Sequence, residues 1–108
     1  MSKSRFLPAF AISLSAFLSA ADAANTKLIV QASRKFNPTD VTIGVGESLN
    51  IINRDDFTHE IYINSGAMNF ESDEQSPGQT VTVTFPALGT FTVRCHIHPR
   101  MSLAVHVK

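Results

Sequence analysis

Three side chains that can bind a soft metal ion lie within seven residues of one another near the end of the chain. Cys95 offers a thiolate, His98 an imidazole and Met101 a thioether, in the spacing Cys-x-x-His-x-x-Met. Sulfur donors are soft and imidazole is borderline, and together they favour copper over hard cations such as Mg²⁺. A second imidazole, His59, stands 36 residues before Cys95. Two histidines, a cysteine and a distant methionine suit a copper ion that changes oxidation state with little rearrangement.

Cys95 is the only cysteine, so the chain cannot form an internal disulfide. Such a cysteine is a small buried apolar residue, a reactive thiol, one half of an intermolecular bridge or a metal ligand. The neighbouring His98 and Met101 favour the metal ligand. The enzymatic alternative is a nucleophilic Cys95–His98 pair. It leaves His59 and Met101 without a role, and no oxyanion-hole motif accompanies it.

The segments around these donors predict short β-strands and no helix. Residues 80–85 and 90–95 alternate between apolar and polar side chains, and β-branched or apolar runs occupy 28–30, 41–43, 49–52, 60–63 and 103–107. Glycine, proline and polar residues separate these runs, and the polar residues 67–78 predict a loop. About seven or eight short strands of this kind predict an all-β fold, either an antiparallel β-sandwich or a Greek-key barrel.

Alternation with a period of two residues predicts which side chains point inward. Phe91 and Val93 share a face with Cys95, so the thiol is expected to point into the protein at the end of its strand. In the last strand, Ala104 and His106 are expected to face solvent. The inner face of that strand carries Leu103, Val105 and Val107.

The first 23 residues have the pattern of a secretory signal peptide: a positive start, an apolar stretch over residues 6–18 and the small-x-small sequence Ala21-Asp22-Ala23. We expect cleavage after Ala23, export to the periplasm and one mature domain over residues 24–108; a retained membrane anchor is the alternative. The mature 85 residues carry seven Lys or Arg and eight Asp or Glu side chains. With this balance and no basic run, nothing indicates a nucleic-acid or anionic-membrane partner.

On these residues the sequence resembles the cupredoxins, which are small blue-copper proteins such as amicyanin, pseudoazurin and plastocyanin. The segment Cys95-His96-Ile97-His98-Pro99-Arg100-Met101 is similar to the short ligand loop of amicyanin-like and pseudoazurin-like members. Residues 48–59 resemble the strand and loop that lead to the first histidine ligand of the family. Phe36-Asn37-Pro38, Val41-Thr42-Ile43 and Gly46-Glu47 resemble its opening hairpin.

The resemblance covers residues 26–108 and implies a cupredoxin-like Greek-key β-sandwich with one type 1 copper ion. By the same resemblance, His59, Cys95 and His98 are the equatorial ligands and Met101 is the axial ligand. Three positions depart from the family pattern: Ile51 replaces a frequent aromatic residue, Glu60 directly follows the first histidine, and His96 follows the cysteine.

Glu60 and His96 are candidates to alter the potential or colour of the copper site, or to hold a second metal ion. Read without the resemblance, both are solvated surface residues. Asp55 and Asp56 are read as a turn. His106 is read as a solvated side chain.

The resemblance implies a monomeric electron carrier that is not an enzyme. His98 is expected to be the ligand nearest solvent, with Arg54 and Arg100 forming a positive rim that orients a redox partner. An apolar patch for brief docking would consist of Phe57, Ile97 and Pro99. A c-type cytochrome, an amine dehydrogenase and a copper oxidase are the partner classes that the resemblance implies. A periplasmic copper carrier or buffer without an electron-transfer role is the alternative.

Overall fold

The computed structural model describes residues 25–108, and the predicted signal peptide, residues 1–23, lies outside the described residues. The described chain forms strands connected by turns and loops, and no helix within it is long and apolar enough to cross a membrane. Its nine strands are β1 (Thr26–Ala32), β2 (Lys35–Asn37), β3 (Asp40–Ile43), β4 (Ser48–Asn53), β5 (Ile61–Asn64), β6 (Asn69–Glu71), β7 (Thr80–Thr84), β8 (Gly89–Cys95) and β9 (Ser102–Val107).

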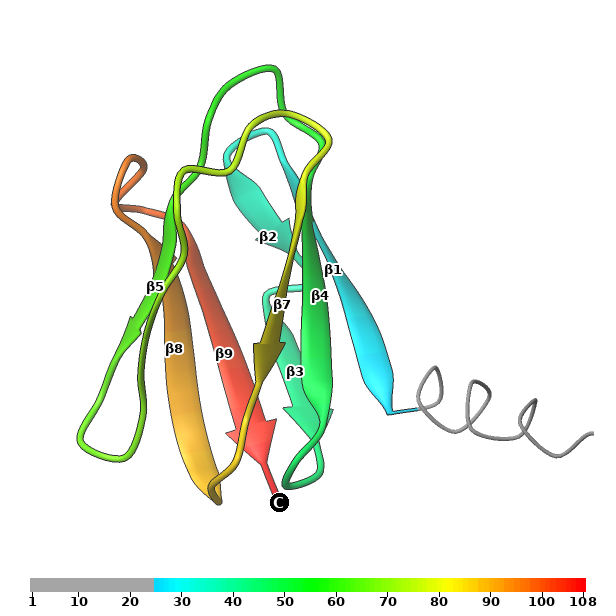
Figure 1. Ribbon diagram of the computed structural model, residues 1–108, viewed down its shortest axis with the longest axis vertical. Helices are drawn as coiled ribbons and strands as arrows, with labels where there is room; N and C mark the ends of the chain where they lie inside the picture. Colours follow the sequence, from blue (N-terminus) through cyan, green and yellow to red (C-terminus); the bar gives the residue numbers. More distant parts are fainter. Residues whose placement is uncertain (1–24) are drawn as a thin grey trace, which may run out of the picture.

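The strands form two sheets that face each other as a sandwich (Figure 1). The four-stranded sheet has the order β2-β1-β4-β7, and the five-stranded sheet has the order β3-β9-β8-β5-β6. Most neighbours are antiparallel, but β1 pairs with β4 and β3 pairs with β9 in parallel. Between β1 and β4 the chain crosses to the other sheet as β3, and such a crossover allows β4 to run in the same direction as β1. The predicted all-β sandwich is confirmed, with these parallel pairs added.

Side chains that alternate along the strands fill the space between the sheets. β8 buries Phe91, Val93 and Cys95, and β9 buries Leu103, Val105 and Val107, as the period of two predicts. Burial of one large apolar side chain contributes about 1.5–3 kcal/mol. A shift of one residue would expose a whole row of them, so this pattern fixes the register of the strands that carry Cys95 and its neighbours.

Two local features differ from the sequence interpretation. Residues 67–78 contain the edge strand β6, which pairs with β5; its three residues are too few for the sequence pattern to predict a strand, and its one apolar side chain, Phe70, packs half-buried against the core. His106 is more than a solvated side chain: its Nε2 lies 3.0 Å from Oδ2 of Asp40, and its Nδ1 lies 3.2 Å from Oγ1 of Thr90. These partners come from β3 and β8, which flank β9, so the pattern along a single strand could not reveal them.

Candidate metal centre

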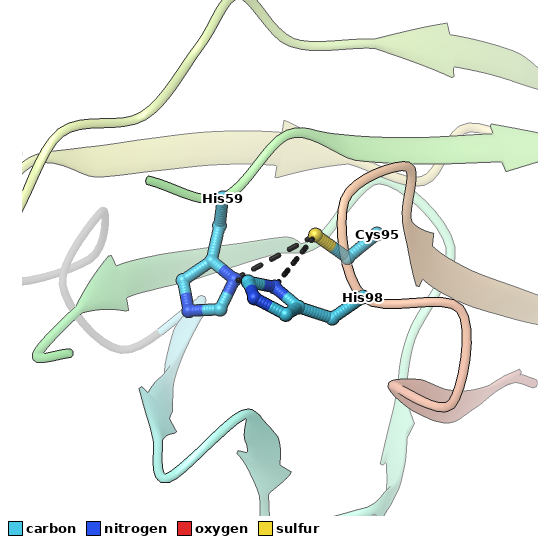
Figure 2. Close-up of side chains that lie close together, drawn as sticks. All are labelled: His59, Cys95 and His98. Atoms are coloured by element: carbon cyan, nitrogen blue, oxygen red, sulfur yellow. Dashed lines mark hydrogen bonds between the residues drawn. The ribbon is translucent and has the colours of Figure 1, made fainter. Parts of the chain in front are cut away.

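The pairing of β5 with β8 brings the predicted ligands together from distant parts of the sequence. Ile61 lies opposite Cys95 in this antiparallel pair. His59 precedes Ile61 by two residues and therefore lies just beyond the end of β8, beside the loop that carries His98. That loop folds back on itself, because the N–H of Met101 donates to the carbonyl of His98 at 3.0 Å. Figure 2 shows His59, Cys95 and His98 turned toward one another.

Three donor atoms converge at this place. Sγ of Cys95 lies 3.6 Å from Nδ1 of His59 and 3.8 Å from Nδ1 of His98, and the two nitrogens are 3.2 Å apart. A first-row metal ion with bonds of about 2.0–2.1 Å to nitrogen and about 2.3 Å to sulfur, at tetrahedral to trigonal angles, separates N from S by about 3.6–3.8 Å and N from N by about 3.3–3.5 Å. The three donors therefore fit one such ion with almost no adjustment.

Met101 is buried with 2% exposure in the same apolar cluster as Cys95, at the end of the loop that carries His98. The donor atoms of His59, Cys95 and His98 all lie within 4.8 Å of one another. Met101 is therefore placed in the core three residues after His98, and its predicted axial role depends on this position.

His59 is completely buried and is held at both its backbone and its ring. Its N–H donates to the carbonyl of Gln75 at 3.0 Å, and its carbonyl accepts from the N–H of Gln75 at 2.7 Å. Its ring Nε2 lies 2.8 Å from Oδ2 of Asp55. A carboxylate can only accept, so the proton lies on Nε2, and in the neutral ring Nδ1 keeps the lone pair that a metal needs.

Asp55 is one residue of the site that the sequence interpretation missed. It was read as part of a turn with Asp56, but its carboxylate also accepts from the N–H of Ser33 at 2.5 Å and of Arg34 at 3.0 Å. These two residues form the turn between β1 and β2 and have positive φ angles of 54° and 57°. One carboxylate thus joins that turn to His59. A carboxylate four residues before a candidate ligand was the available signal, because metal-binding histidines usually donate their other N–H to such a group.

Burial and hydrogen bonding act in opposite directions on the pKa of Asp55. Burial favours the neutral acid, but the hydrogen bonds from His59 and from the N–H groups of Arg34 and Ser33 favour the carboxylate. The hydrogen bonds outweigh burial, so the pKa of Asp55 lies below its usual value. The side chain is therefore an anion when it supports His59 at neutral pH.

A buried amide network fixes the loops around His59. The Asn53 side chain donates to the carbonyls of Phe57 at 2.8 Å and Gln75 at 2.9 Å. The Gln75 side chain donates to the carbonyl of Ile51 at 2.8 Å and accepts from the Gln31 side chain at 2.8 Å. Asn53, Gln75 and Gln31 are at most 1% exposed, and among the buried side-chain polar atoms of the described residues only Oε1 of Gln31 lacks a hydrogen-bond partner. A buried polar network that is satisfied to this extent fixes the local structure around His59.

The sulfur of Cys95 also receives a hydrogen bond from the backbone. The N–H of Glu60 lies 3.4 Å from Sγ, and the carbonyl of Glu60 accepts from the N–H of His96 at 2.9 Å. Hydrogen bonds to a metal-bound sulfur tune the potential of the metal. With a metal bound to Cys95, the partly buried Glu60 would therefore act on the site through its backbone N–H.

His98 lies at the border between the core and solvent. Its ring centroid is 5.1 Å from that of Phe57 and 4.9 Å from that of His59. Burial lowers the pKa of His98 below its usual value, and electrostatic interactions with His59 and Arg34 act in the same direction, against a smaller opposite effect of Asp55. The neutral imidazole is thus favoured, and this is the form that binds a metal.

The surface beside His98 is partly apolar and partly basic. Ile97 is 43% exposed, and Arg34 places its guanidinium 5.5 Å from the centre of the Phe57 ring. A groove next to His98 is lined by Ser33, Arg34, Lys35, Ile97, Pro99 and Arg100. Of the predicted positive rim, Arg100 lines this groove and Arg54 does not. Arg34 of the β1–β2 turn and Lys35 at the start of β2 line it as well, and the sequence interpretation missed both.

Comparison with known proteins agrees with this geometry. The sequence model of the family described as copper binding proteins, plastocyanin/azurin family, matches residues 24–108. The methylamine utilization protein MauL of Methylophilus methylotrophus is 35% identical over 85 residues, in a match that covers 75% of this chain and 48% of MauL. The chain thus spans about half the length of that relative. Plastocyanin of Ulva prolifera is 33% identical over 75 residues, in a match that covers 61% of this chain and 76% of plastocyanin.

Solved structures show the same fold. A reduced variant of amicyanin matches with a TM-score of 0.72 at 23% identity, over 78% of this chain and 83% of amicyanin. The predicted cupredoxin-like sandwich is confirmed, and so is copper as the cofactor. The chain belongs to the plastocyanin/azurin family of copper-binding proteins.

Proposed function

We propose that the chain is a blue-copper electron carrier whose copper is held by His59, Cys95 and His98, with Met101 as a weak axial ligand. The observation that carries this proposal is the convergence of two Nδ1 atoms and one Sγ atom, 3.2–3.8 Å apart, at one end of a β-sandwich. When bound, copper supplies one-electron chemistry between Cu(II) and Cu(I) in such a donor set.

The surrounding residues keep the donors in place when the charge of the site changes. Asp55 and Gln75 hold the ring and the backbone of His59, and the Glu60 N–H holds the sulfur of Cys95. Since a fixed donor set is a compromise between the two oxidation states, neither state requires a large movement. This is the property that a carrier of single electrons needs.

His98 is the ligand through which we expect electrons to enter and leave. It is the only one of the three converging ligands that is not fully buried among the described residues, and it borders the groove lined by Arg34, Lys35 and Arg100. A basic rim attracts a redox partner with an acidic surface and orients it, while the small apolar area allows rapid release. By analogy with the family, the partner is a redox protein.

The thiol of Cys95 has 1% exposure, so an external substrate could not reach it. We therefore infer that the chain is not an enzyme with a Cys95 nucleophile. We further propose that the chain acts as a monomer in the periplasm, after removal of residues 1–23. The signal-peptide pattern of these residues supports export.

The test is to add Cu(II) to residues 24–108 and record visible and EPR spectra and the reduction potential. We expect one copper per chain, a strong visible band from thiolate-to-copper charge transfer, and reversible one-electron cycling. Cys95→Ser should abolish the band. Survival of the band in Cys95→Ser would show that the ligands are misassigned. Ready loss of copper to a chelator during redox cycling would instead favour a copper carrier or buffer.

A further inference from the structure

A second group of metal-binding side chains lies on the outer face of the five-stranded sheet, near the end that carries the copper ligands. Glu60 and Tyr62 are two residues apart, so their side chains share one face, and Tyr62 lies opposite Glu71 on β6 and Arg94 on β8. His96 follows Arg94 by two residues and points to the same side. This arrangement gathers Glu60, Glu71 and His96 from three segments of the chain.

The ligand atoms of these three residues all lie within 4.8 Å of one another. Nε2 of His96 is 3.7 Å from Oε1 of Glu71. A tetrahedral Zn²⁺ ion with bonds of about 2.0–2.1 Å to nitrogen and oxygen separates two such donors by about 3.3 Å. The side chain of Glu71 is 71% exposed, so a movement of a few tenths of an ångström would close this difference.

The ring of His96 is held in place before any ion arrives. It stacks on Tyr62 with a centroid distance of 3.8 Å and an angle of 9° between the planes. Stacking restricts the ring while its Nε2 lies toward Glu71. Part of the ordering of this ligand therefore precedes binding, which reduces the entropic cost of binding.

The charge of this group is also unbalanced. Within residues 25–108, neither Glu60 nor Glu71 forms an ion pair with a lysine or an arginine, and the only ionic contact of Glu71 is with His96. His106 and Asp40 form another surface pair of this type, at 3.0 Å. Among the described residues, no third metal-binding side chain joins that pair. Two carboxylates without a basic partner favour a bound cation.

We propose that Glu60, Glu71 and His96 form a second, surface metal site that binds Zn²⁺ or a similarly borderline divalent ion. An imidazole with two carboxylates suits such ions, whereas Mg²⁺ and Ca²⁺ prefer oxygen donors alone. Three protein ligands leave positions for water, as in open zinc sites. The site is distinct from the copper centre but adjacent to it, because Glu60 also contacts Sγ of Cys95 through its N–H.

The test is calorimetric titration of the copper-loaded protein with Zn²⁺, with Mg²⁺ as the comparison ion and the visible copper band followed in parallel. We expect one Zn²⁺ per chain, no uptake of Mg²⁺ and an unchanged copper band. His96→Phe keeps an aromatic ring for the stack on Tyr62 and removes the donor, and Glu71→Gln alters an exposed side chain. Each should weaken Zn²⁺ binding at least about tenfold, as loss of a supporting contact alone weakens a metal site about 10–100-fold.

Two matched controls distinguish this site from general attraction by surface charge and histidine. Glu74→Gln removes a nearby exposed carboxylate, and His106→Gln removes a half-exposed histidine that is not a copper ligand. Both should bind Zn²⁺ as the unaltered protein does. The proposal is overturned if the copper-loaded protein takes up no Zn²⁺, if His96→Phe binds it unchanged, or if Glu74→Gln weakens binding as much as Glu71→Gln does.

Discussion

Replacing Asp55 by asparagine tests whether this carboxylate sets the properties of the copper site. The carboxylate accepts three hydrogen bonds, from Ser33, Arg34 and His59. If the oxygen of the new asparagine takes the place of Oδ2, the hydrogen bonds from Arg34 and His59 are kept. Its NH₂ group then faces the N–H of Ser33, and that third hydrogen bond is lost. In the other orientation its NH₂ group favours the His59 tautomer with the proton on Nδ1, which cannot bind a metal. Either outcome weakens the support of His59.

The removed charge sets the expected change in potential. A metal bonded to Nδ1 of His59 at about 2 Å would lie about 7 Å from the Asp55 oxygen that is 2.8 Å from Nε2. At that distance the interaction energy of two unit charges is about 0.6 kcal/mol in water and about 2.4 kcal/mol at an effective dielectric constant of 20. These energies correspond to roughly 25–100 mV for one electron. The Asp55 side chain is 8% exposed, so the upper part of this range applies.

Loss of the negative charge destabilises Cu(II) relative to Cu(I), so the potential of Asp55→Asn should rise by this amount. Copper affinity should fall about 10–100-fold, as for other residues that orient a metal ligand. Three hydrogen bonds to a charged group become two to a neutral one, so the free energy of unfolding should drop by about 2–4 kcal/mol.

Voltammetry measures the potential, competition with a chelator measures copper affinity, and urea denaturation measures stability. Asp56→Asn is the matched control, because Asp56 is adjacent and exposed, and its replacement removes the same formal charge. It should shift the potential much less, since solvent screens its charge. Equal shifts in the two variants, or no shift in Asp55→Asn, would refute the reasoning.

Three further predictions follow from the same site. Met101→Gln should retain copper but lower the potential by on the order of 100 mV, because an oxygen ligand favours Cu(II); an unchanged potential would argue against axial ligation. Arg100→Glu should slow electron transfer with an acidic redox partner about 3–10-fold at low salt, with less effect at high salt, whereas Lys108→Glu at the opposite end should not. Folding lowers the pKa of His98 from 6.5 and that of Asp55 from 3.8, so the unfolded chain binds more protons than the folded chain at acidic pH. The free energy of unfolding of the copper-free protein should therefore fall as the pH drops below about 6.5, and fall again below about 4. A flat profile from pH 7 to 3 in urea denaturation would contradict both pKa shifts.

The sequence predicted the parts of the site that depend on local pattern. Cys95, His98 and Met101 are close along the chain, and alternation in β8 correctly placed the thiol inside. The approach of His59 was expected from the resemblance to cupredoxins, and the register of Ile61 with Cys95 now provides its physical basis. The structure thus brings together His59, Cys95 and His98, although His59 is far from the other two in the sequence.

The contacts that were missed join segments whose proximity depends on tertiary structure. Asp55 accepts hydrogen bonds from residues 21 and 22 positions earlier, across the turn between β1 and β2. The pairing of Tyr62 with Glu71 requires the edge strand β6, whose three residues are too few to show a clear alternating pattern. Local periodicity reports which face of a strand is buried, but not which loop will lie beside it. Polar contacts between loops are therefore the part of the site that required coordinates.

The double backbone contact between His59 and Gln75 has a consequence for how the protein matures. Because it orders the histidine within the sandwich itself, the conformational entropy of that ligand is lost during folding and not during metal uptake. A zinc finger, by contrast, folds only when its ion binds. The copper-free domain is thus expected to be a folded receptacle, which an ion can enter or leave without the chain becoming exposed to proteases.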